Sequence, residues 1–544
     1  MSGWVDHVVI APIVVPLLAG TVMILFDEQR RALKAGIGMA SAVAQVVLAI
    51  VLLVLADAAD PQMQTAASIY RLGDWPSLFG IVLVLDRLSA LMVFLTSVLG
   101  VCALLFSLAR WHRAGAHFHS LFQFQLMGLN GAFLTGDLFN LFVFFEVMLA
   151  ASYGLALHGS GLARIRAGLH YIVINLVASL LFLVGVSVIY GIAGTLNMAD
   201  LAVRMASIAE GDRALLETGI AVLGVAFLIK AGMWPLGFWL VPTYSVASTA
   251  SAAIISILSK VGVYALLRLW LLLFSDPASP SFGFGSDWLL VGGLLTIVFG
   301  SVSIMATQNL ARLAGASILV SSGTLLAAIG VGQIEVTGGA LFYLSSSVLA
   351  IAAIFLLVEL VDRGRVLGAD VLAVTREAYG EEGLEEEVEV GVAIPATMAI
   401  LGLSFAACAL LLAGLPPLSG FLGKFAMLAP LIRSGGEDVP LDAWLLLGAL
   451  VASGFATLIA TTRTGIDAFW ASSPDSVPRV SVIEIAPVGV LLALCLGMTV
   501  LAGPVMHYME ATARSLHAPQ GYAEDVLTGQ PAAEPDGATE TDGP

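Results

Sequence analysis

The chain has 544 residues, of which 59% are hydrophobic and only 11% are charged. Soluble domains carry charge on roughly 25% of their residues, so this chain lacks the polar residues that a soluble surface requires. The composition excludes soluble enzymes, nucleic-acid-binding proteins and disordered proteins, and it predicts an all-α polytopic membrane protein. The net charge of −16 is mostly local, since seven Glu lie in 377–389 and six acids lie in the last 24 residues.

A membrane-spanning helix needs about 20 apolar residues. Apolar runs of this kind predict about fourteen spans, and the segment 394–433 is counted as one long interrupted helix. In chain order, the predicted spans are 5–26, 35–56, 84–109, 119–135, 138–158, 169–190, 218–241, 249–270, 287–306, 314–331, 338–361, 394–433, 441–462 and 480–505.

Basic residues in the loops predict the orientation, because inside loops carry an excess of Lys and Arg. With the N-terminus outside, thirteen basic residues fall in inside loops and seven, Arg268 among them, fall in outside segments. This bias predicts that both termini face outward. The three remaining basic residues are Lys230, Lys260 and Lys424, and all three fall inside predicted spans.

Two predicted spans contain helix-breaking residues near their centres. Pro235 follows Lys230, and the pair Pro416 and Pro417 precedes Lys424. Proline removes a backbone donor and kinks a helix, and irregular backbone at membrane depth survives only inside protein or beside a water-filled cavity. Interrupted helices at matching positions of two halves indicate inverted repeats. We therefore predict two inverted five-helix repeats, each containing a broken helix.

These features divide the chain into five parts. They are an N-terminal three-helix segment at 1–118, a first five-helix half at 119–270, a second half at 287–462 with an acidic inside loop at 362–392, a C-terminal helix at 463–513, and a disordered acidic tail at 514–544.

Glu146 is the acidic counterpart of the three lysines within a predicted span. A charge at the bilayer centre costs about 2.5 to 3.5 kcal/mol on insertion scales, so these side chains need partners or water. Burial favours the neutral form of a lysine, whereas a nearby carboxylate favours the charged form. A Glu–Lys pair of adjustable separation can therefore switch a proton; the alternative is a static ion pair that fixes helix packing. Asp86 and Asp137 precede apolar runs and are predicted helix N-caps.

Several motifs of cofactor enzymes are absent from the sequence. It contains no Walker A motif, no Rossmann fingerprint between a strand and a helix, and no CxxC pair among its three cysteines. We therefore predict no cofactor, no metal site and no enzymatic activity of the chain itself.

The run from Thr135 to Leu149 contains Gly-Asp-Leu-Phe-Asn-Leu and Glu146. It resembles helix five of the antiporter-like membrane subunits that are shared by Mrp-type (Pha-type) cation/proton antiporters and the proton-pumping arm of respiratory NADH dehydrogenase. The runs 227–240, 257–268 and 414–425 resemble the same family. The similarity is strong over about 120–430, and the Gly-Asp-Leu-Phe-Asn-Leu motif, the length and Lys424 are most similar to the Mrp D branch of this family.

The resemblance implies a fourteen-helix fold with two inverted five-helix halves and a proton path along a polar axis at the bilayer midplane. By motif, Glu146 matches the helix-five glutamate, Lys230 the broken helix-seven lysine, Lys260 the helix-eight lysine and Lys424 the helix-twelve lysine. Respiratory relatives often carry His in helix eleven and near the start of helix eight. Here these places read Ser345-Ser346-Ser347 and Tyr244-Ser245, which favours a path of serine and water.

The resemblance also implies partners and a location. We expect a multi-pass protein of the bacterial inner membrane that works with the other subunits of a hetero-oligomeric antiporter, exchanging H⁺ for Na⁺, with K⁺ and Li⁺ left open. One alternative is a proton-pumping subunit of a redox complex of the NADH dehydrogenase or membrane hydrogenase type. Another is a scaffold that anchors partner subunits through static ion pairs.

Overall fold

The computed structural model describes residues 7–58, 68–75, 80–365, 396–434, 439–469 and 480–528. The described part is almost entirely helical, apart from a small antiparallel hairpin that pairs Ser68 with Leu85 and Arg71 with Val82. The acidic stretch 377–389 and residues 529–544 lie outside these ranges.

The first group of helices leads from the N-terminus to the middle of the chain. These helices and the hairpin are α2 (Ala11–Ile24), α3 (Arg31–Ala58), β1 (Ser68–Arg71), the 3-10 turn η1 (Leu72–Asp74), β2 (Val82–Leu85), α4 (Arg87–Ser107), the 3-10 turn η2 (Trp111–Arg113), α5 (Phe118–Leu134), α6 (Leu138–Ala156), α7 (Leu162–Ala193), α8 (Met198–Met205), α9 (Glu210–Ala231), α10 (Leu240–Val246), α11 (Thr249–Ile255) and α12 (Leu258–Phe274).

The remaining helices follow after a turn region. They are α13 (Ser286–Ala306), α14 (Leu310–Val331), α15 (Ile334–Arg365), α17 (Ala396–Ala413), α18 (Ser419–Ser434), α19 (Leu441–Phe469), α20 (Val482–Val500), α21 (Ala502–Leu516) and α22 (Pro519–Thr528).

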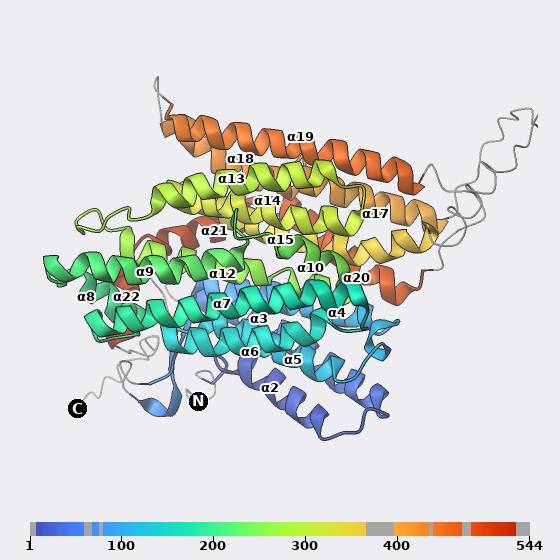
Figure 1. Cartoon of the computed structure of the whole chain (residues 1–544), viewed down its shortest axis with the longest axis horizontal. Helices are drawn as coiled ribbons and strands as arrows, with labels where there is room; N and C mark the ends of the chain where they lie inside the picture. The colour runs from blue at the N-terminus through green and yellow to red at the C-terminus, as the bar shows by residue number, and fades with distance from the viewer. Residues whose placement is uncertain are drawn as a thin grey trace, which may run out of the picture.

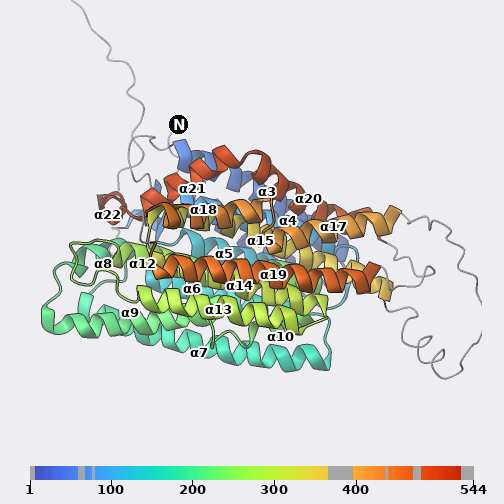
Figure 2. The same ribbon diagram turned by 90° about the horizontal axis from the view of Figure 1, so that it is seen from above.

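The long helices lie side by side along a common direction (Figures 1 and 2). Within the described residues, twelve helices are long and apolar enough to cross a membrane, and α2 adds a shorter apolar helix of 14 residues. This arrangement confirms the all-helical polytopic class. The spans around residues 249–274 and 334–363 are completely buried by protein, whereas α7 exposes a stripe that includes Leu169, Leu180 and Val184. Helices α11, α12 and α15 therefore form the centre of the bundle, and α7 faces its surroundings.

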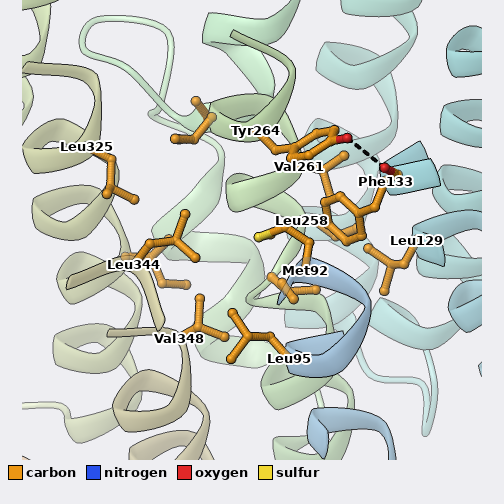
Figure 3. Packing of buried hydrophobic residues seen from close by; sticks show 14 of the residues in the cluster. Met92, Leu95, Leu129, Phe133, Leu258, Val261, Tyr264, Leu325, Leu344 and Val348 are labelled. Atoms are coloured by element: carbon orange, nitrogen blue, oxygen red, sulfur yellow. Dashed lines mark hydrogen bonds between the residues drawn. The ribbon is translucent and has the colours of Figure 1, made fainter. Parts of the chain in front are cut away.

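The central core brings together helices that are far apart in the sequence (Figure 3). The Tyr264 hydroxyl donates to the backbone oxygen of Phe133 at 2.6 Å, which joins α12 to α5. The labelled apolar side chains of the same cluster are Met92 and Leu95 of α4, Leu129 of α5, Leu258 and Val261 of α12, Leu325 of α14, and Leu344 and Val348 of α15.

The C-terminal region differs from the prediction. The expected disordered tail is wrong for residues 514–528, because α21 continues to Leu516 and α22 follows it. Tyr522, Ala523 and Val526 form one buried face of α22, which packs against α8 and α12. The low average hydropathy concealed this short amphipathic face. The single helix expected at 463–513 is likewise two helices, α20 and α21.

The contact between α9 and α12 depends on a residue without a side chain. A Cβ atom on Gly262 of α12 would lie 2.7 Å from the backbone oxygen of Phe227 and 2.8 Å from the backbone nitrogen of Ala231 in α9. The two backbones therefore approach each other directly beside Lys230. Small residues permit such close packing of membrane helices.

We predict that Gly262→Ala lowers the thermal stability of the protein, because overpacking a tight contact costs about 1 to 3 kcal/mol. Thermal unfolding of the purified protein, followed by size-exclusion chromatography with fluorescence detection, measures the effect. Gly448→Ala is the matched control, since a Cβ there meets nothing within 4 Å. Equal unfolding temperatures for the two variants would contradict the close contact.

Candidate functional site

The chain leaves helical geometry at the two predicted breaks. Helix α9 ends at Ala231, where Gly232 has a φ of 78°, and α10 begins at Leu240. Helix α17 ends at Ala413, where Gly414 has a φ of 73°, and α18 begins at Ser419. The left-handed conformation at both positions suits glycine. Both interruptions therefore begin with the same Ala-Gly end of a helix, followed by the prolines Pro235, Pro416 and Pro417.

Lys230 lies in the last turn of α9 and is buried, with an exposed fraction of 4%. Its ammonium nitrogen has no hydrogen-bond partner in the described part of the chain and lies 5.0 Å from the centre of the Phe145 ring. Such a cation–π contact is favourable, the more so when the cation is desolvated. Lys230 is therefore a buried cation whose three donors remain available.

Glu146 lies on α6, next to Phe145, and interacts electrostatically with Lys230. Its carboxylate accepts a hydrogen bond from the Ser179 hydroxyl of α7 rather than from the lysine. The buried hydroxyl of Tyr153, two turns further along α6, has no partner among the described residues. The carboxylate is thus close to Lys230 and bonded to a different helix.

Lys260 lies in the first turn of α12, and its exposed fraction is 1%. Its ammonium donates to the Ser322 hydroxyl of α14 at 3.1 Å. The span expected at 249–270 contains a short gap between α11 and α12 at residues 256 and 257, just before this lysine. Since Gly262 packs against α9 beside Lys230, the backbone segments that carry the two lysines are in contact.

Lys424 lies on α18 and is also buried, with an exposed fraction of 6%. Its ammonium donates to the backbone oxygen of Ala413 at 3.0 Å. That oxygen belongs to the last residue of α17, where helix carbonyls lack an intrahelical partner. Lys424 therefore satisfies the open end of the interrupted helix.

Serine pairs connect the helices between Lys260 and Lys424. Ser321, the neighbour of Ser322 on α14, donates to Ser347 of α15 at 2.9 Å. Ser346 of α15 is bonded to Ser419 of α18 at 2.8 Å. Ser321, Ser346 and Ser347 line a small cavity of about 10 Å³, which is about the space that one water molecule needs. In contrast, Ser345 bonds the carbonyl of Leu341 within its own helix.

The prediction that Arg268 lies in an outside segment is wrong. Arg268 is buried in α12, two turns after Lys260, and its guanidinium binds both carboxylate oxygens of Asp86 and the Tyr264 hydroxyl. Asp86 also caps α4 by accepting from the backbone nitrogen of Ser89, and Asp137 likewise caps α6, so both predicted N-caps are confirmed. Burial alone raises the pKa of the Asp86 carboxyl, but Arg268 and Ser89 bring it below its usual value.

Sequence reasoning missed these partners for identifiable reasons. Ser179 and Ser322 lie on other helices than Glu146 and Lys260, at 33 and 62 residues from them in the sequence, and serine is common in apolar helices. Arg268 did carry a signal, because Lys260, Tyr264 and Arg268 recur every four residues and so share a face of one helix. Among the described residues, no group of three or more His, Cys, Asp or Glu could bind a metal ion.

Comparison with known proteins shows the family of the chain. Residues 135–437 match the family described as NADH:quinone oxidoreductase/Mrp antiporter, TM. The chain is 56% identical to the D subunit of a probable K(+)/H(+) antiporter of Rhizobium meliloti (strain 1021), over 97% of this chain and 99% of that one. It is 33% identical to the D subunit of a Na(+)/H(+) antiporter of Alkalihalophilus pseudofirmus, over 96% and 99%. The chain therefore belongs to this family of multi-pass membrane proteins.

Two solved structures share the fold. A chain of the Mrp complex from Dietzia sp. DQ12-45-1b is 24% identical, with a TM-score of 0.79 over 97% of this chain and 100% of that chain. A chain of respiratory complex I from Thermus thermophilus is 23% identical, with a TM-score of 0.70 over 96% and 99%. At these identities the likeness concerns the fold alone.

We predict that Asp86→Asn strongly destabilises the protein, because it leaves the buried Arg268 without its counter-ion. Removing one partner of a buried ion pair costs about 3 to 5 kcal/mol. The matched control is Asp57→Asn, since Asp57 pairs with Arg87 at 3.1 Å while its own side chain is 60% exposed. Exposed pairs contribute about 0 to 1 kcal/mol. Thermal unfolding measures both variants, and a similar loss in each would contradict the importance of burial.

Proposed function

We propose that this chain is the proton-translocating membrane subunit of a multisubunit monovalent-cation/proton antiporter. The observation that carries this proposal is the presence of three buried lysines and Glu146 within residues 135–437, the segment that matches the family. The two relatives from Rhizobium meliloti and Alkalihalophilus pseudofirmus are named as parts of antiporters for K⁺ or Na⁺ with H⁺. The chain would do no redox chemistry itself and would need no cofactor.

Glu146 and Lys230 would form the proton switch of the first half. When the carboxylate approaches Lys230, it stabilises the charged ammonium; when it bonds Ser179, burial favours release of the proton. The bond from Ser179 and the unpartnered ammonium correspond to the separated arrangement. A small shift of α6 relative to α7 would therefore change the proton affinity of Lys230 without opening the bundle.

Lys260 would pass the proton between the two halves, and Lys424 would serve the second half. The bond from Lys260 to Ser322 and the serine pairs of α14, α15 and α18 provide polar groups between Lys260 and Lys424. Serine hydroxyls donate and accept, so they support a chain of water molecules. The contact of Lys424 with the open end of α17 would change whenever that lysine lost its charge.

The proposal extends to the architecture. Residues 119–270 and 287–462 would be two inverted five-helix halves, preceded by a segment at 1–118 and followed by α20 and α21. Counting α2 and α5 with the twelve longer spans gives fourteen membrane helices. The pairs α9–α10 and α17–α18 would be the broken helix of each half, which is supported by their shared Ala-Gly ends.

We also propose that the chain works in the inner membrane of a bacterium, together with the other subunits of the complex, with both termini on the outer side. The cation that is exchanged for H⁺ is Na⁺ or K⁺, and Li⁺ is left open. Because the relative at 56% identity is named for K⁺ and the one at 33% for Na⁺, both ions belong in the same assay.

A second candidate is a proton-pumping subunit of a redox complex. It is favoured by the family description, which includes NADH:quinone oxidoreductase, and by the likeness to a chain of complex I. Flavin or iron–sulfur proteins that purify with the chain would support this candidate. A purely structural role of the chain is the outcome expected if its charges can be neutralised without effect.

The test is cation-dependent dissipation of ΔpH in everted vesicles that contain the whole complex and an independent respiratory chain. We expect Glu146→Gln and Lys230→Ala each to lower the Na⁺- or K⁺-induced rate at least about tenfold, the effect typical of a lost proton-transfer group. Arg312→Ala is the control, because Arg312 is exposed.

Complex assembly is checked for each variant by purification of the intact complex. Unchanged dissipation in assembled variants, Lys424→Ala included, would leave the chain as a scaffold. If the unaltered complex shows no cation response at all, the redox-pump candidate takes first place.

A further inference from the structure

A second set of buried polar side chains lies between α3 and α5, outside the proposed proton path. We call it the α3–α5 polar file. It consists of Ser41 and Gln45 on α3 and of His119, Gln123 and Asn130 on α5, together with Ser120, the chain neighbour of His119. None of these six residues is more than 6% exposed, and Gln45, Gln123 and Asn130 are 0% exposed.

Direct hydrogen bonds link the two helices at two levels. At the first level, the Ser41 hydroxyl donates to the Gln123 amide oxygen at 2.7 Å, and the Gln123 amide nitrogen donates to the backbone oxygen of Gly38 at 3.1 Å. At the second level, the Asn130 amide nitrogen donates to the Gln45 side-chain oxygen at 3.0 Å and to the backbone oxygen of Pro12 at 2.9 Å. The polar contact therefore extends over several turns of both helices.

These bonds leave several buried atoms unsatisfied. The Gln45 amide nitrogen, the Asn130 amide oxygen, both ring nitrogens of His119 and the Ser120 hydroxyl have no partner among the described residues. An unsatisfied polar group in a buried site destabilises the folded protein. The Gln45 amide nitrogen is an unused donor, and the Asn130 amide oxygen is an unused acceptor. One bridging water molecule satisfies such a donor and acceptor together.

A dry polar contact is the simpler explanation, since serine and amide side chains often join membrane helices. A dry contact should pair its polar atoms, because neither lipid nor a dry core can replace water. The polar atoms of this helix interface that have no partner are instead typical of groups that bond water.

The α3–α5 polar file also meets an opening. A cleft of about 510 Å³ lies at the start of α5, and its lining includes His117, Ser120 and His158. Ser120 thus belongs both to the cleft and to the file. From His119 to Asn130 the file covers about 16 Å along α5, which is roughly half of the hydrocarbon thickness of a bilayer.

We propose that the α3–α5 polar file is a water-filled half-channel that opens at this cleft and ends at Asn130. The half-channel binds water, and protons move along this water to the middle of the N-terminal helices. Asn130 lies one turn before Phe133, whose backbone oxygen accepts from Tyr264. Tyr264 in turn lies one turn after Lys260 on α12. The half-channel thus ends one turn from the contact between α5 and α12, and it rests on its own contacts and not on the proposed function.

Cysteine reactivity in the whole complex, held in lipid nanodiscs, tests this proposal. Both faces of the complex are then open to the probe, which is Ag⁺ in dilute solution. Ag⁺ reacts with the thiolate form of a cysteine, and the thiolate forms where water reaches the thiol. We therefore expect Ser41→Cys to react at least about tenfold faster than Ala42→Cys. Ala42 is the matched control, since it neighbours Ser41 on α3 and is 0% exposed among apolar residues.

The native cysteines Cys102, Cys408 and Cys495 are buried and set the background rate. Equal rates for the two variants would overturn the proposal. If Ser41→Cys does not assemble, radiolytic hydroxyl labelling of the unaltered complex replaces it, because the radicals form from bound water. His119 is then expected to be oxidised at least about tenfold faster than Cys102, after correction for intrinsic reactivity. Protection of His119 would overturn the proposal equally.

Discussion

The structure depends on one constraint: a charge inside a membrane-embedded bundle must find its partner within the protein. Lipid offers no hydrogen bonds, and burial of an unpaired charge is costly. Each buried lysine meets this constraint differently. Lys260 donates to a side chain, Lys424 donates to a free helix carbonyl, and Lys230 lies over an aromatic ring with its donors unused. Among the residues that the structure describes, none of the three has a closed ion pair like the one that fixes Arg268.

In the proposed function, that difference separates structural charges from those that carry protons. Arg268 and Asp86 share two contacts, and Tyr264 and Ser89 satisfy what remains, so this pair has no reason to change its proton content. Lys260 and Lys424 instead donate to neutral oxygens, and these weaker contacts change when the ammonium becomes an amine. Weak partners lower the stability of the folded protein. A proton path nevertheless requires them, because a group that is fully stabilised in one charge state cannot exchange protons readily.

The sequence predicted the positions of these charges but not their partners. Lysines stand out in long apolar runs, and prolines mark the breaks, so both signals are local. Partners come from tertiary packing: Ser322 lies 62 residues from Lys260, and Ser419 lies 73 residues from Ser346. Arg268 was misplaced because it lies near the end of an apolar run. Helix α22 was missed because its apolar face is too short to change the average composition of the C-terminal region.

In the proposed function, one proton path joins both halves through Lys260, which lies between the Glu146–Lys230 pair and the serine pairs. The most direct measurement is proton movement by the reconstituted complex, driven by an imposed Na⁺ or K⁺ gradient and followed with a pH dye. We expect Lys260→Ala to abolish this movement while the complex stays assembled. Proton movement at the unaltered rate in the assembled variant would contradict the shared path and would make Lys260 a structural residue.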